Sequence, residues 1–376
     1  MYFLVLSYTK NLKKINKILI IIQRSNGDVF MSSKLIKELN KYYLSPQIDL
    51  LVNDDTVEVA KLLPNINYIH TFSYQKKLDN QWLQEKNIIK NIFKKYDLSI
   101  NLTSSDRSVI YALLAANTSI SAIEKDNTKS WWKKILLTNY YYFDFNNHIL
   151  CNNLESLNLL EINYENSLPS LPVSNRAIDN IKSKLRKYGI ANFVIFHPSA
   201  QYKYKIYPQH LRDELIGYLN KLGIPILITG SRNSIDAEIK KELPLLSNVF
   251  DLIGETNLEE YFALSQLSSA YIGMDTLNMH IAASQNKRIF AIFGPTKLSM
   301  WSPWSNHSKI SANKDAPIQT YDNVTIFQAN MVCVACGKAG CNDKHGRSEC
   351  LYNIDPKIIY KEVDNWHKGL EIEMKI

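Results

Sequence analysis

The sequence predicts an α/β protein made of two Rossmann-like domains. The 376-residue chain is long enough for two domains with separate cores. In both halves, short apolar runs alternate with segments of helical spacing, which is typical of parallel sheets covered by helices. A segment rich in Ser, Pro and Asn at 166–176 has linker composition. We therefore expect one domain over 17–172 and a second over 173–376.

The elements of the first domain begin with a strand at 17–23, whose β-branched and apolar residues are typical of burial on both faces. A turn at 24–28 and a helix over 29–42 follow. Further strands are expected at 47–52, 67–70 and 98–102, with a helix from about 56. This alternation indicates a parallel sheet.

The second domain repeats the plan. Apolar runs predict strands at 192–197, 224–229, 249–252, 270–273 and 288–293. Helices are expected after Tyr207, from Ser234, and over 258–267 and 278–285. Ligands of open α/β sheets bind at the carboxyl ends of strands, so the turns there are the candidate sites.

The formal charge is +8, and residues 1–150 hold 20 Lys and Arg against 13 Asp and Glu. Such a surface attracts nucleic acid, an anionic membrane face or an acidic substrate. Nucleic acid is not expected, because the lysines are dispersed along helices instead of interleaved with aromatic residues.

A basic extension at 1–16 carries Lys10, Lys13 and Lys14. Two interpretations of this extension stay open: it contacts an anionic bilayer, or it is a solvated terminus. No apolar run approaches the roughly 20 residues of a membrane span, and no secretory signal is recognisable, so a cytoplasmic protein is expected.

The first candidate turn is Ser25-Asn26-Gly27-Asp28, at the end of the first strand. Gly27 permits a tight turn. The position of Asp28 at the start of a helix leaves two interpretations open: it is a helix N-cap, or it is a functional carboxylate.

The second candidate turn runs from Met274 to His280. Asp275 and Thr276 are placed to cap a helix whose N–H groups, at the positive end of the dipole, suit a diphosphate. His280 lies one turn into that helix, and its direction, toward a ligand or toward the core, stays open.

Three more polar turns follow strands of the second domain. Lys205 lies on a loop after the strand ending at His197, where a lysine neutralises a phosphate as a point charge. Gly230 and Thr296 follow the strands ending near Thr229 and Phe293.

Taken in order, these motifs resemble glycosyltransferase family 9, which contains the ADP-heptose:lipopolysaccharide heptosyltransferases. The similarity runs from about residue 17 to about 365, over Ser25–Asp28, His197–Pro208, Asp251–Leu258, Gly273–Ala283, Phe293–Thr296 and Trp301–Trp304. It implies a GT-B fold, in which two Rossmann-like domains face a central cleft, the first binding the acceptor and the second the nucleotide sugar.

The resemblance also implies roles for individual residues. Asp28 matches the acidic residue that serves as general base, and Lys205 the lysine that meets the donor's phosphates. The donor loop is matched by Asp275, Thr276 and His280. Less directly, Met274, Gly230 and Thr296 are expected on the donor side, and Ser25 and Gly27 on the acceptor side.

The implied reaction is inverting transfer of a heptose from ADP-heptose to the anionic inner core of lipopolysaccharide or lipooligosaccharide, at the inner face of the inner membrane. No cofactor or metal is expected, since Asp54-Asp55 is not a spaced Asp-x-Asp motif. Leu277 replaces a small residue of the family, and Tyr207 a tryptophan. Transfer from another nucleotide sugar, epimerisation, or nucleotide binding with weakened catalysis therefore remain open.

Four cysteines, Cys333, Cys336, Cys341 and Cys350, lie within the segment 333–350. Their spacing, with His345 nearby, is one that a zinc ion uses. A structural metal, a redox pair and reduced packing cysteines are all open, and a catalytic role is not expected.

Overall fold

The computed structural model describes residues 15–373, which fall into two compact units. Unit 1 runs to Phe143 and includes Asn153–Tyr164, whereas unit 2 holds Asp144–Asn152 and the chain from Glu165 onward. The change of unit after Tyr164 and the predicted boundary after residue 172 both lie in the irregular segment 162–174. Of the basic extension at 1–16, only the last two residues are described.

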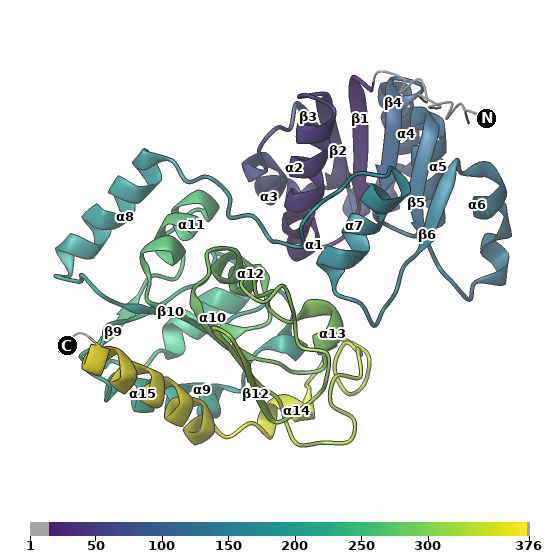
Figure 1. Cartoon of the computed structure of the whole chain (residues 1–376). Coiled ribbons are helices and arrows are strands. Elements are labelled where there is room, and N and C mark those ends of the chain that lie inside the picture. Colours follow the sequence, from purple (N-terminus) through teal and green to yellow (C-terminus); the bar gives the residue numbers. More distant parts are fainter. Residues whose placement is uncertain (1–14, 374–376) are drawn as a thin grey trace, which may run out of the picture. The chain divides into compact units, whose positions relative to one another are not determined.

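Unit 1 is a parallel sheet flanked by helices (Figure 1). Its six strands have the order β3-β2-β1-β4-β5-β6, the Rossmann order. They are β1 (Lys17–Ile22), β2 (Gln47–Asn53), β3 (Tyr68–Phe72), β4 (Tyr96–Asn101), β5 (Ala116–Ile123) and β6 (Asn139–Tyr142). The helices are α1 (Asn26–Met31), α2 (Ser33–Tyr42), η1 (Asp54–Thr56), α3 (Val57–Leu62), α4 (Tyr74–Ile92), α5 (Asp106–Ala115), η2 (Thr128–Ser130) and α6 (Trp131–Leu136). Helix α7 (Ile149–Leu159) contributes residues to both units.

Unit 2 repeats this plan in a seven-stranded sheet of order β12-β13-β11-β10-β7-β8-β9. Only β12 is antiparallel to its neighbour. The strands are β7 (Val194–His197), β8 (Ile226–Ile228), β9 (Val249–Asp251), β10 (Ala270–Met274), β11 (Arg288–Ile292), β12 (Ile318–Tyr321) and β13 (Val324–Phe327). The helices are α8 (Asn175–Lys187), η3 (Lys203–Lys205), α9 (Gln209–Asn220), α10 (Ser234–Glu242), α11 (Leu258–Leu267), α12 (Leu277–Ser284), α13 (Leu298–Trp301), α14 (Glu349–Tyr352) and α15 (Pro356–Glu373).

Successive side chains of the central strand β7 point to opposite faces of the unit 2 sheet, and both faces are covered by a hydrophobic core. Val194 and Phe196 of β7 belong to one core cluster, and Ile195 between them belongs to another. All three side chains are fully buried. The predicted α/β class with parallel sheets is thereby confirmed.

Some predicted elements differ from the structure. The helix expected over 29–42 begins at Asn26 and is broken at Ser32 into α1 and α2. Strand β5 was not expected, because it follows α5 directly, with Ala115 and Ala116 at the junction and no turn residue to mark it.

Gly273 is a position of unit 2 that requires glycine. Its φ of +151° is rarely adopted by L side chains, and an added Cβ would lie 2.4 Å from the carbonyl oxygen of His197 on the neighbouring strand. Because backbone cannot move aside like a flexible side chain, we predict that Gly273→Ala destabilises unit 2 by roughly 2–3 kcal/mol.

Chemical denaturation of the purified protein measures this effect. Gly217→Ala in α9 is the matched control, since an added Cβ there meets nothing within 4 Å. The control should be neutral or stabilising by up to about 1 kcal/mol. Equal stability of the two variants would contradict the steric explanation.

Candidate active site

Asp28 lies in the first turn of α1, directly after β1, and is 3% exposed. Ser25 is the N-cap of this helix. The Asp28 Oδ2 atom accepts a hydrogen bond from the Ser25 hydroxyl at 2.6 Å and another from the Ser25 N–H at 3.2 Å. Asp28 is therefore the acidic partner in a capping box, and its interpretation as the N-cap itself is wrong.

Arg24 holds the other oxygen of this carboxylate. Its Nε lies 2.8 Å from Asp28 Oδ1, and its guanidinium is 4.8 Å from the centre of the Phe143 ring. The Asn53 amide donates to the Arg24 carbonyl from the end of β2. The buried carboxylate is thus charge-compensated and fixed in orientation. Ser25 is exposed beside it, and Gly27 is half-buried.

In unit 2, the structure brings together two predicted residues that are 70 positions apart. Lys205 Nζ donates to Asp275 Oδ2 at 2.8 Å. Lys205 ends η3 on the loop after β7, and Asp275 directly follows β10, the strand paired with β7. Asp275 is buried, whereas the Lys205 side chain keeps a quarter of its surface exposed.

The first turn of α12 is not capped as predicted. Thr276 is the N-cap by position, but its side chain makes no cap hydrogen bond. The Asp275 carboxylate is directed to Lys205 instead. Of the N–H groups of this turn, that of Met279 donates to the Thr276 carbonyl at 3.2 Å, and the Thr276 side chain leaves those of Leu277 and Asn278 uncapped. These two N–H groups lie at the positive end of the helix dipole, which suits an anion. Leu277 is the first residue of α12 and is half-buried.

Met274 and His280 lie beneath this loop. Met274 ends β10 and is 1% exposed within the core. His280 is 2% exposed, with its ring centre 6.5 Å from that of Trp301. Both side chains are therefore buried in unit 2, and their places on the donor side stay predictions.

His197 links the ends of strands β7 and β8 to helix α12. One ring nitrogen lies 3.1 Å from the Thr229 hydroxyl, and the Asn278 amide of α12 approaches the ring at 3.1 Å. Burial lowers the pKa of His197 to about 4, although the nearby Asp236 carboxylate acts in the opposite direction. The ring is therefore neutral at neutral pH and joins β7, β8 and α12 without adding charge.

Gly230 lies beside a second buried carboxylate, Asp236 of α10. An added Cβ at Gly230 would lie 2.7 Å from Asp236 Oδ1. Asp236 Oδ2 accepts hydrogen bonds from the Ser231 N–H and hydroxyl, both at 2.7 Å. This Ser–Asp arrangement repeats the one formed by Ser25 and Asp28 in unit 1.

Thr296 is half-buried after β11, in a turn that the cysteine-rich segment contacts. Gly337 donates to the Pro295 carbonyl, and Ser348 donates to the carbonyl of Tyr204, next to Lys205. The His345 ring lies 5.4 Å from that of Tyr202 on the same loop. The segment thus packs against the loop that carries Lys205.

Among residues 15–373, no group of three or more His, Cys, Asp or Glu side chains, those of the four cysteines included, is arranged to hold a metal ion. Burial raises the pKa of the Cys350 thiol to about 11, whereas Cys333, Cys336 and Cys341 are exposed. The alternatives for this cluster stay predictions.

Comparison with known proteins identifies relatives over most of the chain. A family model described as glycosyltransferase family 9 (heptosyltransferase) matches residues 86–329. Lipopolysaccharide heptosyltransferase 3 of Escherichia coli is 25% identical over 291 residues, covering 76% of this chain and 85% of that protein. Lipooligosaccharide heptosyltransferase 2 of Haemophilus ducreyi is 24% identical over 93% of this chain and 98% of its own length.

Solved structures of similar fold include E. coli ADP-heptose lipopolysaccharide heptosyltransferase II, with a TM-score of 0.69 and 18% identity over 94% of this chain and 99% of that chain. An E. coli heptosyltransferase solved with ADP has a TM-score of 0.67 and 14% identity, over 93% of this chain and 99% of that chain. Heptosyltransferases have the GT-B fold, and the parallel sheets of units 1 and 2 agree with it.

Two buried histidines give unit 2 a testable pH dependence. Burial lowers the pKa of His197 to about 4 and that of His148 to about 3, from an ordinary value of 6.5. Below pH 6.5 the unfolded chain binds protons that the folded unit excludes. Stability should therefore fall as the pH drops from 6.5 toward 4.

Urea denaturation at a series of pH values measures this slope, and His148→Gln isolates one contribution. His148 packs against Trp304 and donates to the Ser302 carbonyl. Each such histidine contributes up to about 1.4 kcal/mol per pH unit in this window, so the variant should have a shallower slope. Parallel curves for the two proteins would contradict the assignment.

Proposed function

This chain belongs to glycosyltransferase family 9, the heptosyltransferase family, and on that premise we propose that it moves a heptose from ADP-heptose to the inner core of lipopolysaccharide or lipooligosaccharide. The enzyme is a glycosyltransferase. The observation that carries the residue-level proposal is the 2.8 Å pair of Lys205 and Asp275 beside the uncapped first turn of α12.

Unit 2 is proposed to bind the donor at this pair. A diphosphate fits there because the lysine supplies a positive charge and the α12 N–H groups supply donors. Asp275 orients the Lys205 ammonium, and Thr276, Gly230 and Thr296 line neighbouring strand ends. Adenosine diphosphate is favoured as the nucleotide by similar heptosyltransferases solved with ADP and with ADP-2-deoxy-2-fluoro heptose.

Unit 1 is proposed to supply the base. A carboxylate has about four acceptor positions, and Ser25 and Arg24 use three of those of Asp28. The remaining position is available to take the proton of the acceptor hydroxyl. The hydroxyl oxygen then attacks the anomeric carbon on the face opposite the diphosphate, and the configuration inverts.

Negative charge grows on the departing diphosphate as the bond to the anomeric carbon breaks. The Lys205 ammonium and the α12 dipole stabilise this charge because both are already in place before the reaction. We propose that these groups provide the electrostatic stabilisation that a divalent cation supplies in other transferases.

The acceptor is proposed to be an anionic, membrane-anchored saccharide at the cytoplasmic face of the inner membrane. The excess of Lys and Arg in residues 1–150 favours such a partner. None of the described helices is long and apolar enough to cross a membrane. The proposed contact with the bilayer is therefore peripheral.

Substitutions at Asp28 and Lys205 test the two roles separately. Asp28→Asn should lower kcat for heptose transfer by about 10²–10⁴, because the base is lost, with little change in the Kd for ADP. Lys205→Met should weaken ADP binding and also lower kcat, because it meets the diphosphate in both ground and transition states.

Matched controls are available in each unit. Asp49→Asn removes another buried carboxylate of unit 1, one that accepts from the Tyr96 hydroxyl. Lys203→Met removes the exposed lysine of the same η3 turn. Both controls should keep near-normal transfer. Normal turnover by Asp28→Asn would show that the base assignment is wrong.

A further inference from the structure

Helix α6 of unit 1 exposes large apolar side chains to solvent. Trp131, Ile135 and Leu136 are 63%, 68% and 59% exposed. Trp131 and Ile135 are four residues apart and lie on one side of α6, and Leu136 is the exposed last residue of the helix. We refer to these three residues as the α6 patch. Clustered apolar side chains of this size on a protein surface mark an interaction site.

The outward direction of the patch is fixed by a buried lysine on the same helix. Lys133 is fully buried, and its Nζ lies 2.8 Å from Asp106 and 2.9 Å from Glu124. It also donates to the Ser104 carbonyl. Since these bonds hold one side of α6 against the unit, the opposite side must face outward.

The surroundings of the patch are basic and aromatic. Lys125, Lys129 and Lys134 are exposed on α6 or on the segment leading into it. The Lys134 ammonium lies 5.2 Å from the centre of the half-exposed Tyr142 ring on β6. Of the nearby acidic groups, Asp106 and Glu124 are paired with Lys133, which leaves Asp126 as the exposed carboxylate in the 125–134 segment.

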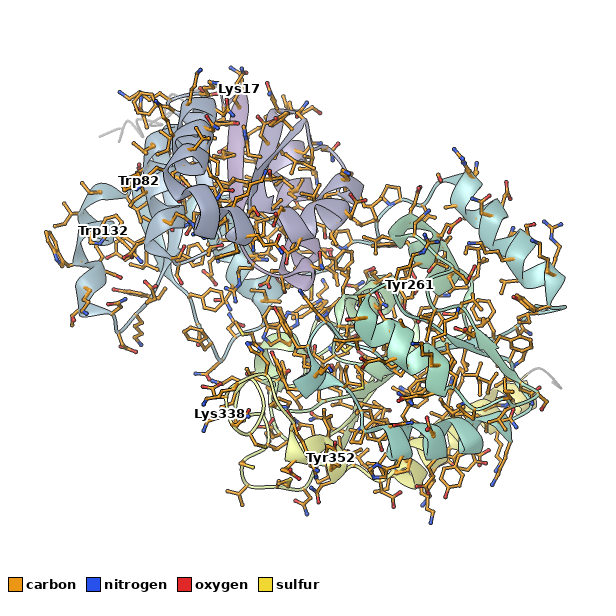
Figure 2. The ribbon with its side chains drawn as sticks, turned by 180° about the vertical axis from the view of Figure 1, so that it is seen from behind. Lys17, Trp82, Trp132, Tyr261, Lys338 and Tyr352 are labelled. Atoms are coloured by element: carbon orange, nitrogen blue, oxygen red, sulfur yellow. The ribbon has the colours of Figure 1, made fainter. Side chains whose placement is uncertain are left out.

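This composition matches the interface of an anionic bilayer. Tryptophan and tyrosine prefer the headgroup level, aliphatic side chains enter the acyl region, and lysines meet phosphate groups. The patch also lies at the rim of the sheet, because β6, which follows α6, is an edge strand. Figure 2 shows Trp132, the neighbour of Trp131, at this outer rim of unit 1.

The patch is tied to the edge of the sheet that carries Asp28. Lys133 binds the carbonyl of Ser104, on the loop after β4, and β4 is paired with β1. Asp28 follows the carboxyl end of that neighbouring strand. A bilayer against α6 would therefore lie close to the base of unit 1.

We propose that the α6 patch docks unit 1 onto an anionic lipid bilayer, with Trp131, Ile135 and Leu136 entering the interface and the adjacent lysines meeting lipid phosphates. This inference rests on the proposed function, because a membrane-anchored acceptor is what would make docking near Asp28 useful.

Vesicle flotation of the full chain tests the proposal. The wild-type protein should float with phosphatidylglycerol-containing vesicles, float poorly with phosphatidylcholine vesicles, and lose binding as salt is raised. Trp131→Ser/Ile135→Ser should reduce binding by at least about tenfold. Lys129→Glu/Lys134→Glu should reduce it on anionic vesicles.

The matched control is Trp82→Ser/Leu83→Ser on α4, since these side chains of the same unit are 84% and 54% exposed. It removes similar apolar surface elsewhere and should bind vesicles normally. All variants should unfold at the wild-type temperature and transfer heptose normally to a lipid-free acceptor oligosaccharide. That activity reports on the proposed function independently of docking.

Three outcomes would overturn the proposal. In the first, the α6 variant floats as wild type does, and in the second, the α4 control is the variant that loses binding. Alternatively, wild-type protein stays off vesicles and forms a dimer that the α6 substitutions disrupt, in which case a second copy occupies the patch.

Discussion

Parallel strand pairing is the constraint on which the candidate site residues of each unit depend. It places the carboxyl ends of neighbouring strands at one edge of the sheet, so residues far apart in the chain meet there. In unit 2 the pairing of β7 with β10 brings Lys205 within 2.8 Å of Asp275. Gly273 makes this close approach possible, because a side chain there would collide with the backbone of β7.

The two units contain the same serine–aspartate hydrogen-bond arrangement, with a different proposed role in each. In each, a buried aspartate in the first turn of a helix accepts the N–H and hydroxyl of a serine at the preceding strand end. In unit 1 Arg24 adds a charge partner and the carboxylate is the proposed base. In unit 2 Asp236 lies next to Gly230 and His197, at the edge proposed to bind the donor.

Sequence reasoning located strands and their polar ends, because apolar runs bounded by turn residues identify both. It selected Asp28, Lys205 and Asp275 from those positions and from the family resemblance. It missed Arg24, His197, Asn278 and Asp236, since their roles depend on tertiary contacts. Asn278, for example, meets His197 across 81 residues. The predicted capping of α12 by Asp275 failed for the same reason, because the Asp275 carboxylate pairs with Lys205, and the Thr276 side chain makes no cap hydrogen bond.

The most direct test of the account is calorimetric titration of the purified protein with ADP, UDP and GDP, with and without EDTA. The account predicts that ADP binds most tightly and that EDTA leaves its affinity unchanged, because Lys205 and the α12 N–H groups hold the diphosphate. Preference for UDP or GDP would contradict the use of ADP-heptose. Loss of ADP binding in EDTA would contradict the proposed role of the Lys205–Asp275 pair.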